Sequence, residues 1–185
     1  MIQYITRSHR MDAGHRVKNE KMKCFNFHSH SFKIDLTYSF EQIQEIGYAV
    51  DFKEIKRTHC QFIDDFMDHG FIANPEDNGI INLCKEEGSK LWIMSLNGDS
   101  YCNPSAENLG KELFLAIDYL TKKSYPLLTL HKIILYETPN CSVTTYSNSI
   151  SELEQSNFLA YRQIQLDMYA EKMGVLEYDD RKVNQ

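Results

Sequence analysis

The chain has 185 residues, a formal net charge of −6, 42% hydrophobic residues and 25% charged residues. This length is sufficient for one full hydrophobic core and too short for two large domains. No apolar stretch approaches the roughly 20 residues that cross a bilayer, and residues 1–11 lack the apolar core of a secretory signal. We therefore expect a cytoplasmic globular protein with one main domain and an appendage.

The cysteines and the charge distribution narrow the function classes further. Five cysteines are scattered along the chain without a C-x-x-C pair, which argues against a disulfide framework and favours free thiols in a reducing compartment. The negative net charge disfavours nonspecific nucleic-acid binding. Residues 1–33 nevertheless carry seven Lys or Arg against two acidic residues, which leaves −11 on the remaining chain. This basic island is either a solvated loop or a surface that attracts an anionic substrate.

Two β-hairpins are predicted, with a minor strand between them. A first strand starts near residue 2 and ends at residues 11–15, and a loop over about residues 16–23 leads to the next strand. That strand, residues 28–40, alternates strictly between apolar and polar positions, so one of its faces is buried. The remaining strands are predicted at residues 91–96, 131–138 and 142–146.

Two helices are predicted to pack on one face of this sheet. The first starts at Asp51, with Glu54 as the reciprocal partner of the cap, and ends near Gly70. Its buried stripe is expected to comprise Phe52, Ile55, His59, Phe62, Ile63 and Phe66. The second helix opens at residues 103–105 and buries Leu109, Leu113, Ile117 and Leu120. Residues 71–90 indicate only irregular or locally helical structure.

The last part of the chain has helical periodicity. Residues 151–173 place Tyr161, Ile164 and Met168 on one face, Gly174 stops the helix, and a charged end follows. We thus expect an α+β domain at residues 1–148, with an antiparallel sheet and two helices on one face, and a helical extension at residues 149–185.

Histidines at the start of the strand over residues 28–40 suggest a metal site. His28 and His30 lie two residues apart, so they share one face of the strand. His15, at the end of the preceding strand, is the natural third ligand, and a three-histidine zinc site leaves a fourth position open for substrate. His9 and His59 are expected to be a polar or a core histidine rather than ligands.

Five further residues are candidates for acid-base chemistry or substrate binding. Cys24 is either a small buried apolar residue or a thiolate next to a cation, where it would serve as a base. The Asp68-His69 dipeptide at a helix end resembles an oriented acid-base pair. Glu107, in the first turn of the second helix, complements the helix dipole or contributes to substrate binding. Glu137 lies in an apolar strand and is expected to face a group that needs a carboxylate.

Six motifs resemble, in order and approximate spacing, those of the 6-pyruvoyltetrahydropterin synthase superfamily, and the resemblance covers about residues 1–148. They are His15, Cys24-x-x-x-His28-x-His30-Ser31-Phe32, Tyr48-Ala49-Val50-Asp51-Phe52, Met67-Asp68-His69, Asn103-Pro104-Ser105-Ala106-Glu107-Asn108 and Tyr136-Glu137-Thr138. The spacer between the cysteine and the histidine pair resembles that of the bacterial 6-carboxytetrahydropterin synthases of queuosine biosynthesis. Ser29 departs from the glycine that is usual between the two histidines, and residues 75–102 form a longer segment than in the shortest members.

The resemblance implies a tunnelling fold (T-fold), in which subunits assemble into a barrel with active sites between them. A homo-oligomer, with a hexamer favoured, and a bound Zn²⁺ are expected. The resemblance assigns zinc ligation to His15, His28 and His30, proton transfer to Cys24, Asp68 and His69, and substrate binding to Glu137, which anchors the pterin ring, and Glu107. The implied enzyme is a zinc-dependent carbon-carbon lyase. It would convert 7,8-dihydroneopterin triphosphate into 6-carboxy-5,6,7,8-tetrahydropterin, acetaldehyde and triphosphate, a step towards queuosine.

Three alternatives remain open. A 6-pyruvoyl-forming enzyme would act on the same substrate without losing carbon from its side chain. A zinc- or pterin-binding module without catalysis would not need the bases Cys24, Asp68 and His69. An ordinary antiparallel α+β domain would require six motif matches in order to be coincidence. None of these hypotheses includes a nucleic acid or a membrane as a partner.

Overall fold

The computed structural model describes residues 1–97 and 101–174 and contains a six-stranded sheet in the order β4-β3-β1-β2-β5-β6. The strands are β1 (Gln3–His15), β2 (His28–Phe40), β3 (Gly70–Ala73), β4 (Leu91–Ile93), β5 (Thr129–Thr138) and β6 (Cys141–Thr145). The neighbours β1-β2, β2-β5 and β5-β6 are antiparallel, whereas β1-β3 and β3-β4 are parallel. The sheet is therefore mostly antiparallel, as predicted, with two parallel strands at one edge.

The segment over residues 71–90 is more regular than the sequence indicated. The strand β3 pairs with the end of β1 on one side and with β4 on the other. The helix α3 (Asn78–Glu86) follows it, which confirms the local helix. Because β3 has only four residues, its identity as a strand comes from pairing with distant segments rather than from a local pattern.

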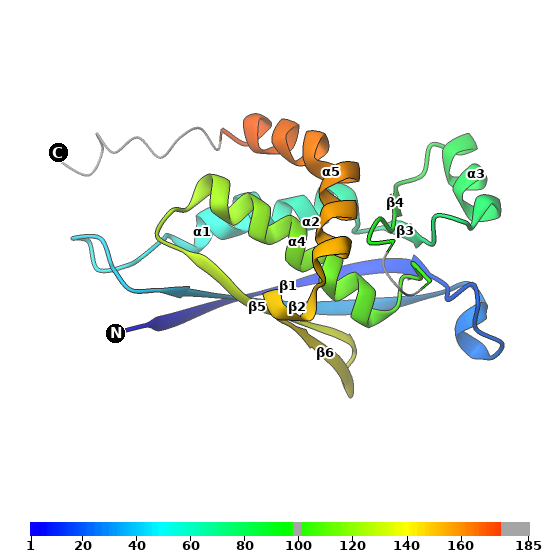
Figure 1. Cartoon of the computed structure of the whole chain (residues 1–185), viewed down its shortest axis with the longest axis horizontal. Helices are drawn as coiled ribbons and strands as arrows, with labels where there is room; N and C mark the ends of the chain where they lie inside the picture. Colours follow the sequence, from blue (N-terminus) through cyan, green and yellow to red (C-terminus); the bar gives the residue numbers. More distant parts are fainter. Residues whose placement is uncertain (98–100, 175–185) are drawn as a thin grey trace.

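The helices that cover the sheet lie on one of its faces (Figure 1). They are α1 (Phe52–Ile55), the π-helical turn η2 (Lys56–Cys60), α2 (Gln61–Phe66), α4 (Ala106–Ser124) and α5 (Glu152–Lys172), and two short 3-10 turns are η1 (Lys23–Phe25) and η3 (Ser147–Ser149). The segments α1, η2 and α2 follow one another without a break, so they correspond to the first predicted helix.

Two details of this first helix differ from the prediction. Phe52 was expected in the buried stripe but is 47% exposed. It is the first residue of α1, so no preceding helical turn lies under its side chain. Asp51 caps the helix by accepting a hydrogen bond from the Lys53 amide, but Glu54 pairs with Arg57 instead of completing a reciprocal cap.

The alternation of β2 is confirmed by burial. Phe32, Ile34, Leu36 and Tyr38 are all fully buried in the main core. The predicted stripe of α4 belongs to the same core through Leu109, Leu113, Ile117 and Leu120. The helices cover this face of the strand (Figure 1). The prediction that only one face is buried is wrong in the middle of the strand, where Asp35 and Thr37 are buried on the opposite face.

The helix α5 packs against α4, and its end contacts α2 through rings of Tyr169 and Phe62 whose centroids are 5.2 Å apart. Its buried apolar side chains are Phe158, Leu166, Tyr169 and Ala170. Tyr161, Ile164 and Met168 are exposed, so the face singled out in the sequence faces outward. Gly174 has φ +63° and ends the helix, while the charged end predicted after it lies outside the described residues.

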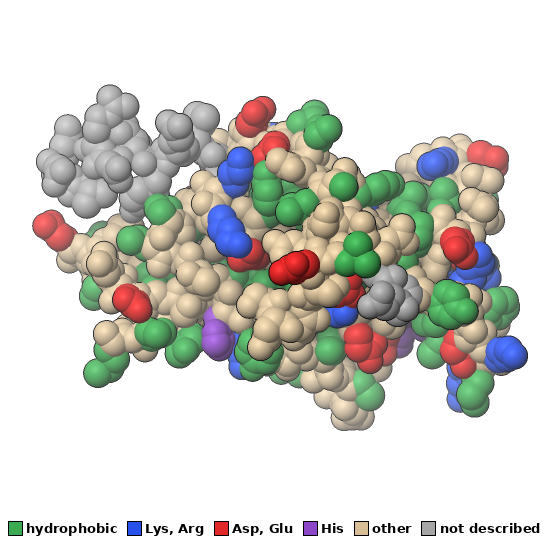
Figure 2. All heavy atoms as spheres, in the orientation of Figure 1, with side chains coloured by type: hydrophobic (Ala, Val, Ile, Leu, Met, Phe, Trp, Pro, Cys, Tyr) green, Lys and Arg blue, Asp and Glu red, His purple; other side chains and the backbone are tan. Residues whose placement is uncertain are grey.

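The surface charges, the cysteines and the helices resemble those of an ordinary globular protein. Acidic and basic side chains lie interspersed on the face shown in Figure 2 rather than in one patch. All five cysteines are free thiols, as predicted. Within residues 1–97 and 101–174, no helix combines the length and the apolar character needed to span a membrane.

Candidate metal centre and surrounding residues

Three histidines converge where β1 ends and β2 begins. The antiparallel register places His15 opposite His28, and Ala13 opposite His30. One ligand atom of each histidine lies within 4.8 Å of those of the other two, and no other such group of His, Cys, Asp or Glu occurs in the part of the chain described. Ser29, between the pair, is exposed on the opposite face of the strand, so it does not enter the cluster.

Hydrogen bonds to backbone carbonyls fix the rings of two of the three histidines. Nδ1 of His15 donates to the carbonyl of Pro104 at 2.6 Å, and Nδ1 of His28 donates to the carbonyl of Asn26 at 2.8 Å. Because a carbonyl only accepts, each Nδ1 carries a proton, so Nε2 is the nitrogen through which the neutral ring can bind a metal ion. Nε2 of His15 is buried without a hydrogen-bond partner. Such an orphaned acceptor beside two more imidazoles fits a bound metal ion.

Burial also keeps His15 in the form that a metal requires. Its side chain is almost completely buried, and desolvation lowers its pKa, although the Pro104 carbonyl opposes this shift. The imidazole is therefore neutral at physiological pH. Neutral imidazole is the form that binds metal.

Glu137 lies at the wall of this cluster. It shares a face of β5 with Ile133 and Leu135, as its position in the sequence indicated. Its Oε1 atom lies 3.7 Å from Nε2 of His15 and 3.8 Å from Nε2 of His30. The carboxylate is thus an acceptor placed directly beside the ligand nitrogens.

Cys24 is exposed within η1, in the loop that joins β1 to β2. Its carbonyl accepts a hydrogen bond from the Val17 amide at 2.8 Å, which closes the loop across its width. The interpretation of Cys24 as a small buried apolar residue is therefore wrong. Its thiol does not belong to the cluster of ligand atoms.

Asp68 and His69 form a direct pair. Oδ2 of Asp68 accepts from Nδ1 of His69 at 2.6 Å, and Oδ1 accepts from the Asp12 amide at 2.7 Å. Burial raises the pKa of Asp68, but these two hydrogen bonds, together with the charges of His69 and Lys90, outweigh it and hold the pKa below its usual value. The helix ends at Phe66, and His69 rather than Gly70 takes the positive φ, +55°. This turn leaves the His69 imidazole largely exposed.

The other candidates are placed more simply. Glu107 is exposed in the first turn of α4, where it complements the helix dipole. Nε2 of His9 bonds to Asp64 at 2.7 Å, and Nδ1 of His59 bonds to the Tyr38 hydroxyl at 2.6 Å in the core. Neither belongs to the metal cluster, as predicted.

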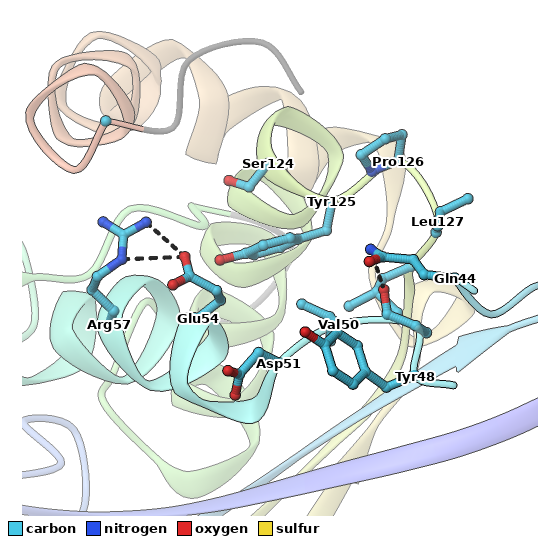
Figure 3. Close-up of a pocket in the computed structure, with 13 residues that line it drawn as sticks. Gln44, Tyr48, Val50, Asp51, Glu54, Arg57, Ser124, Tyr125, Pro126 and Leu127 are labelled. Carbon is cyan, nitrogen blue, oxygen red and sulfur yellow. Dashed lines mark hydrogen bonds and ion pairs between the residues drawn. The ribbon is translucent and has the colours of Figure 1, made fainter. Parts of the chain in front are cut away.

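A cavity of about 380 Å³ lies beside the start of α1 (Figure 3). Its lining includes the motif residues Tyr48, Ala49, Val50 and Asp51 and, across from them, residues 124–128. This cavity follows the end of β2, whereas the histidines lie at its beginning. A strand of 13 residues separates the two places by roughly 40 Å.

Sequence reasoning missed the residues that fasten the loop between β1 and β2. Arg16 pairs with Asp77, and the buried Asn103 bonds to the Lys18 amide and to Asn74. The only local signal was the position of Arg16 directly after His15. The partners come from distant segments, so no spacing rule identifies them.

Comparisons with known proteins agree with the resemblance. A profile described as 6-pyruvoyl tetrahydropterin synthase matches residues 4–148. A protein of Rickettsia bellii named 6-carboxy-5,6,7,8-tetrahydropterin synthase is 31% identical over 139 residues, which cover 75% of this chain and 96% of the relative. A protein of the same name from Aquifex aeolicus is 27% identical over 154 residues, with 72% of this chain and 91% of the relative covered.

Solved structures share the fold. The uncharacterized protein WS1659 from Wolinella succinogenes has a TM-score of 0.61 at 21% identity, covering 80% of this chain and 99% of its own. The 6-pyruvoyl tetrahydropterin synthase of Caenorhabditis elegans has a TM-score of 0.54 at 18% identity, covering 80% of this chain and 96% of its own. At such identities the likeness concerns the fold alone.

Proposed function

Because the chain belongs to the 6-pyruvoyl tetrahydropterin synthase family and has its tunnelling fold, we propose that it is a zinc-dependent carbon-carbon lyase. The substrate is 7,8-dihydroneopterin triphosphate, and the products are 6-carboxy-5,6,7,8-tetrahydropterin, acetaldehyde and triphosphate. The relatives named 6-carboxy-5,6,7,8-tetrahydropterin synthase support this choice within the family. The observation that carries it is the convergence of His15, His28 and His30 with an orphaned, buried Nε2.

Zinc is the metal that this donor set suits best. Three neutral imidazoles are typical of catalytic zinc, which keeps a fourth position open. When bound, the ion would polarise oxygens of the substrate side chain and acidify the adjacent C–H and O–H groups. The proposed ligands are His15, His28 and His30, each oriented by its strand.

Proton transfers are assigned to residues outside the ligand set. Cys24, exposed on its loop, removes a proton from the substrate side chain as a thiolate. His69, oriented by Asp68 through the 2.6 Å hydrogen bond, acts as the second acid-base group. Two bases on separate segments allow protons to be removed and returned at different atoms.

Binding of the pterin ring is assigned to Glu137. A carboxylate can accept two parallel N–H donors, which a neutral side chain cannot reproduce. Its closeness to the ligand nitrogens requires the ring to bind directly beside the metal. Glu107 is assigned a supporting role in substrate binding, from its place in the first turn of α4.

We also propose that the active enzyme is a homo-oligomer, with a hexamer favoured. Residues 48–51 of the Tyr48–Phe52 motif line a cavity at the opposite end of β2 from the histidines of the same chain. Tyr48 and Phe52 are also 41% and 47% exposed. If both motifs serve one site, they come from different copies. Native mass spectrometry tests the assembly, and a monomer that turns over substrate would contradict it.

The domain boundary is part of this proposal. We assign residues 1–148 to the catalytic domain and residues 149–185 to an extension, which contains the helix α5 in its described part. The end of the family match at residue 148 supports this division.

Product identification tests the reaction. Zinc-loaded protein is incubated with 7,8-dihydroneopterin triphosphate, and the products are identified by mass. We expect the carboxylated pterin together with acetaldehyde and triphosphate. A pyruvoyl product, with no loss of carbon, would instead assign the 6-pyruvoyl-forming reaction. Unchanged substrate would leave only a binding role.

A further inference from the structure

The loop that carries Cys24 is fastened to a distant segment through Arg16. Nε and one terminal nitrogen of Arg16 each donate to a carboxylate oxygen of Asp77, both at 2.6 Å. The Asp77 side chain is 3% exposed, so this bidentate pair is shielded from water on the acidic side. The two parallel bonds fix the plane of the guanidinium as well as its position.

The same guanidinium contacts two aromatic rings of the loop. Its central carbon lies 4.4 Å from the ring centroid of Phe27 and 5.2 Å from that of Phe25. Phe25 directly follows Cys24, and Phe27 directly precedes His28. Both rings are substantially exposed, so burial in the core does not hold them. The cation contacts both rings, and the Phe27 ring also meets the Phe71 ring edge-on, with centroids 5.7 Å apart.

The other restraints on this loop are mostly polar. The η1 turn that contains Cys24 has no buried residue. The Val17 amide donates to the Cys24 carbonyl at 2.8 Å, the Lys18 amide donates to Oδ1 of Asn103 at 3.0 Å, and Nδ2 of Asn103 donates to Asn19 at 3.2 Å. The Val17 contact closes the loop on itself and the Asn103 contacts hold its first residues, whereas Arg16 fastens the rings that follow Cys24 to the distant Asp77.

From these contacts we propose that Arg16, held by Asp77, is a positioning residue that sets the place of Cys24 relative to His28. This inference rests on the proposed function of Cys24 as a base. Catalytic groups must be held closely, because a misplacement of about 1 Å can lower a rate roughly 100-fold. A lysine at position 16 would keep the charge but lose the planar fork and most of the stacking.

The test compares Arg16→Lys and Asp77→Asn with the unchanged chain. We expect each variant to bind one zinc as before, with kcat lowered by about 10- to 100-fold and KM within about threefold. The double variant should lose little more than the worse single variant, because both changes break the same pair. Lys18→Ala is the matched control, since it removes the ion pair and the hydrogen bond of Lys18 to Glu76 from the same loop without touching the Arg16 guanidinium, and its kcat should stay within about twofold.

Amide hydrogen exchange provides a readout that does not depend on turnover. Arg16→Lys and Asp77→Asn should speed exchange over residues 17–27 and leave β2 unchanged, whereas Lys18→Ala should change neither. Unaltered exchange and kcat in Arg16→Lys would overturn the inference, as would loss of zinc in proportion to kcat. If the unchanged chain does not turn over the substrate, the proposed function fails, and the exchange comparison alone then decides whether Arg16 holds the loop.

Discussion

Nδ1 of His15 donates a 2.6 Å hydrogen bond to the carbonyl of Pro104, which lies 89 residues further along the chain. This contact joins the end of β1 to the residue just before the cap of α4. It fixes the ring and directs Nε2 into the histidine cluster. One hydrogen bond therefore couples the helix layer of the fold to the proposed metal centre.

Removing the His15 ring should weaken metal binding. We expect His15→Ala to weaken zinc binding by at least about 100-fold, because the loss of outer partners of metal ligands alone costs 10- to 100-fold. Competition titration with a chromophoric chelator measures the affinity. His9→Ala is the control, since His9 bonds to Asp64 away from the cluster. Undiminished zinc affinity in His15→Ala would show that His15 is not a ligand.

Cys24 should be needed for turnover but not for metal. Cys24→Ala is expected to keep one zinc per chain and to lower kcat by about 100- to 10,000-fold, the range for losing a general base. Elemental analysis and steady-state kinetics measure the two effects. The matched control is Cys141→Ala, which removes the other exposed thiol. Loss of zinc from Cys24→Ala would make this residue a ligand and refute its assigned role.

Glu137→Gln keeps the size of the side chain and removes its charge. We expect kcat/KM to fall by about 10- to 150-fold, which corresponds to one charge-assisted hydrogen bond of roughly 1.5–3 kcal/mol. Kinetics with the pterin substrate measure this loss. The exposed Glu152, in the first turn of α5, offers the control Glu152→Gln, which should have no effect. Equal activity in both variants would exclude Glu137 as the anchor of the ring.

The histidine cluster could be predicted because its position follows from local rules of strand geometry. Strict alternation over residues 28–40 places His28 and His30 on the buried face, and a hairpin brings the end of the preceding strand beside them. The parity of Glu137 with Ile133 indicated its face in the same way. Period-two patterns in strands are set by backbone geometry, so they are readable without the fold.

Features that depend on distant partners could not be predicted. The strand β3 is defined by pairing with β1 and β4, and the pair between Arg16 and Asp77 spans 61 residues. The buried face of α5 includes Arg162, whose guanidinium lies 3.6 Å from the centre of the Trp92 ring. Because Glu154 and Arg162 interrupt the apolar residues of the buried face, the sequence prediction named the exposed Tyr161, Ile164 and Met168 instead.

The buried His59 should make the free energy of unfolding depend on pH. Burial lowers the pKa of His59 to about 3, so it stays neutral when folded but binds a proton below about 6.5 when unfolded. Its depressed pKa means that this stability is fully present above pH 6.5 and is lost as the pH falls towards 3. Between pH 7.5 and pH 5, the free energy of unfolding should fall by about 2 kcal/mol more than in His59→Gln.

Urea denaturation of both chains at the two pH values measures this difference. Glutamine keeps a polar side chain near the Tyr38 hydroxyl but does not titrate, so it isolates the ionisation of His59. Parallel pH dependence in the two chains would show that His59 does not contribute to acid sensitivity.

The two faces of α5 should respond differently to truncation. Phe158 is fully buried, so Phe158→Ala is expected to lower the free energy of unfolding by about 3–5 kcal/mol. Tyr161 is 58% exposed, and Tyr161→Ala should change it by less than about 0.5 kcal/mol. Urea denaturation measures both variants. Similar values would contradict the packing of α5 on the core.

The most direct test of the central claim is a zinc titration of the metal-stripped protein with 7,8-dihydroneopterin triphosphate as substrate. The proposed site predicts no turnover without metal and a linear rise that ends at one zinc per chain. The same titration of His28→Ala should yield no turnover at stoichiometric zinc. Full turnover by the stripped protein, or a rise unaffected in His28→Ala, would contradict a three-histidine zinc centre in this enzyme.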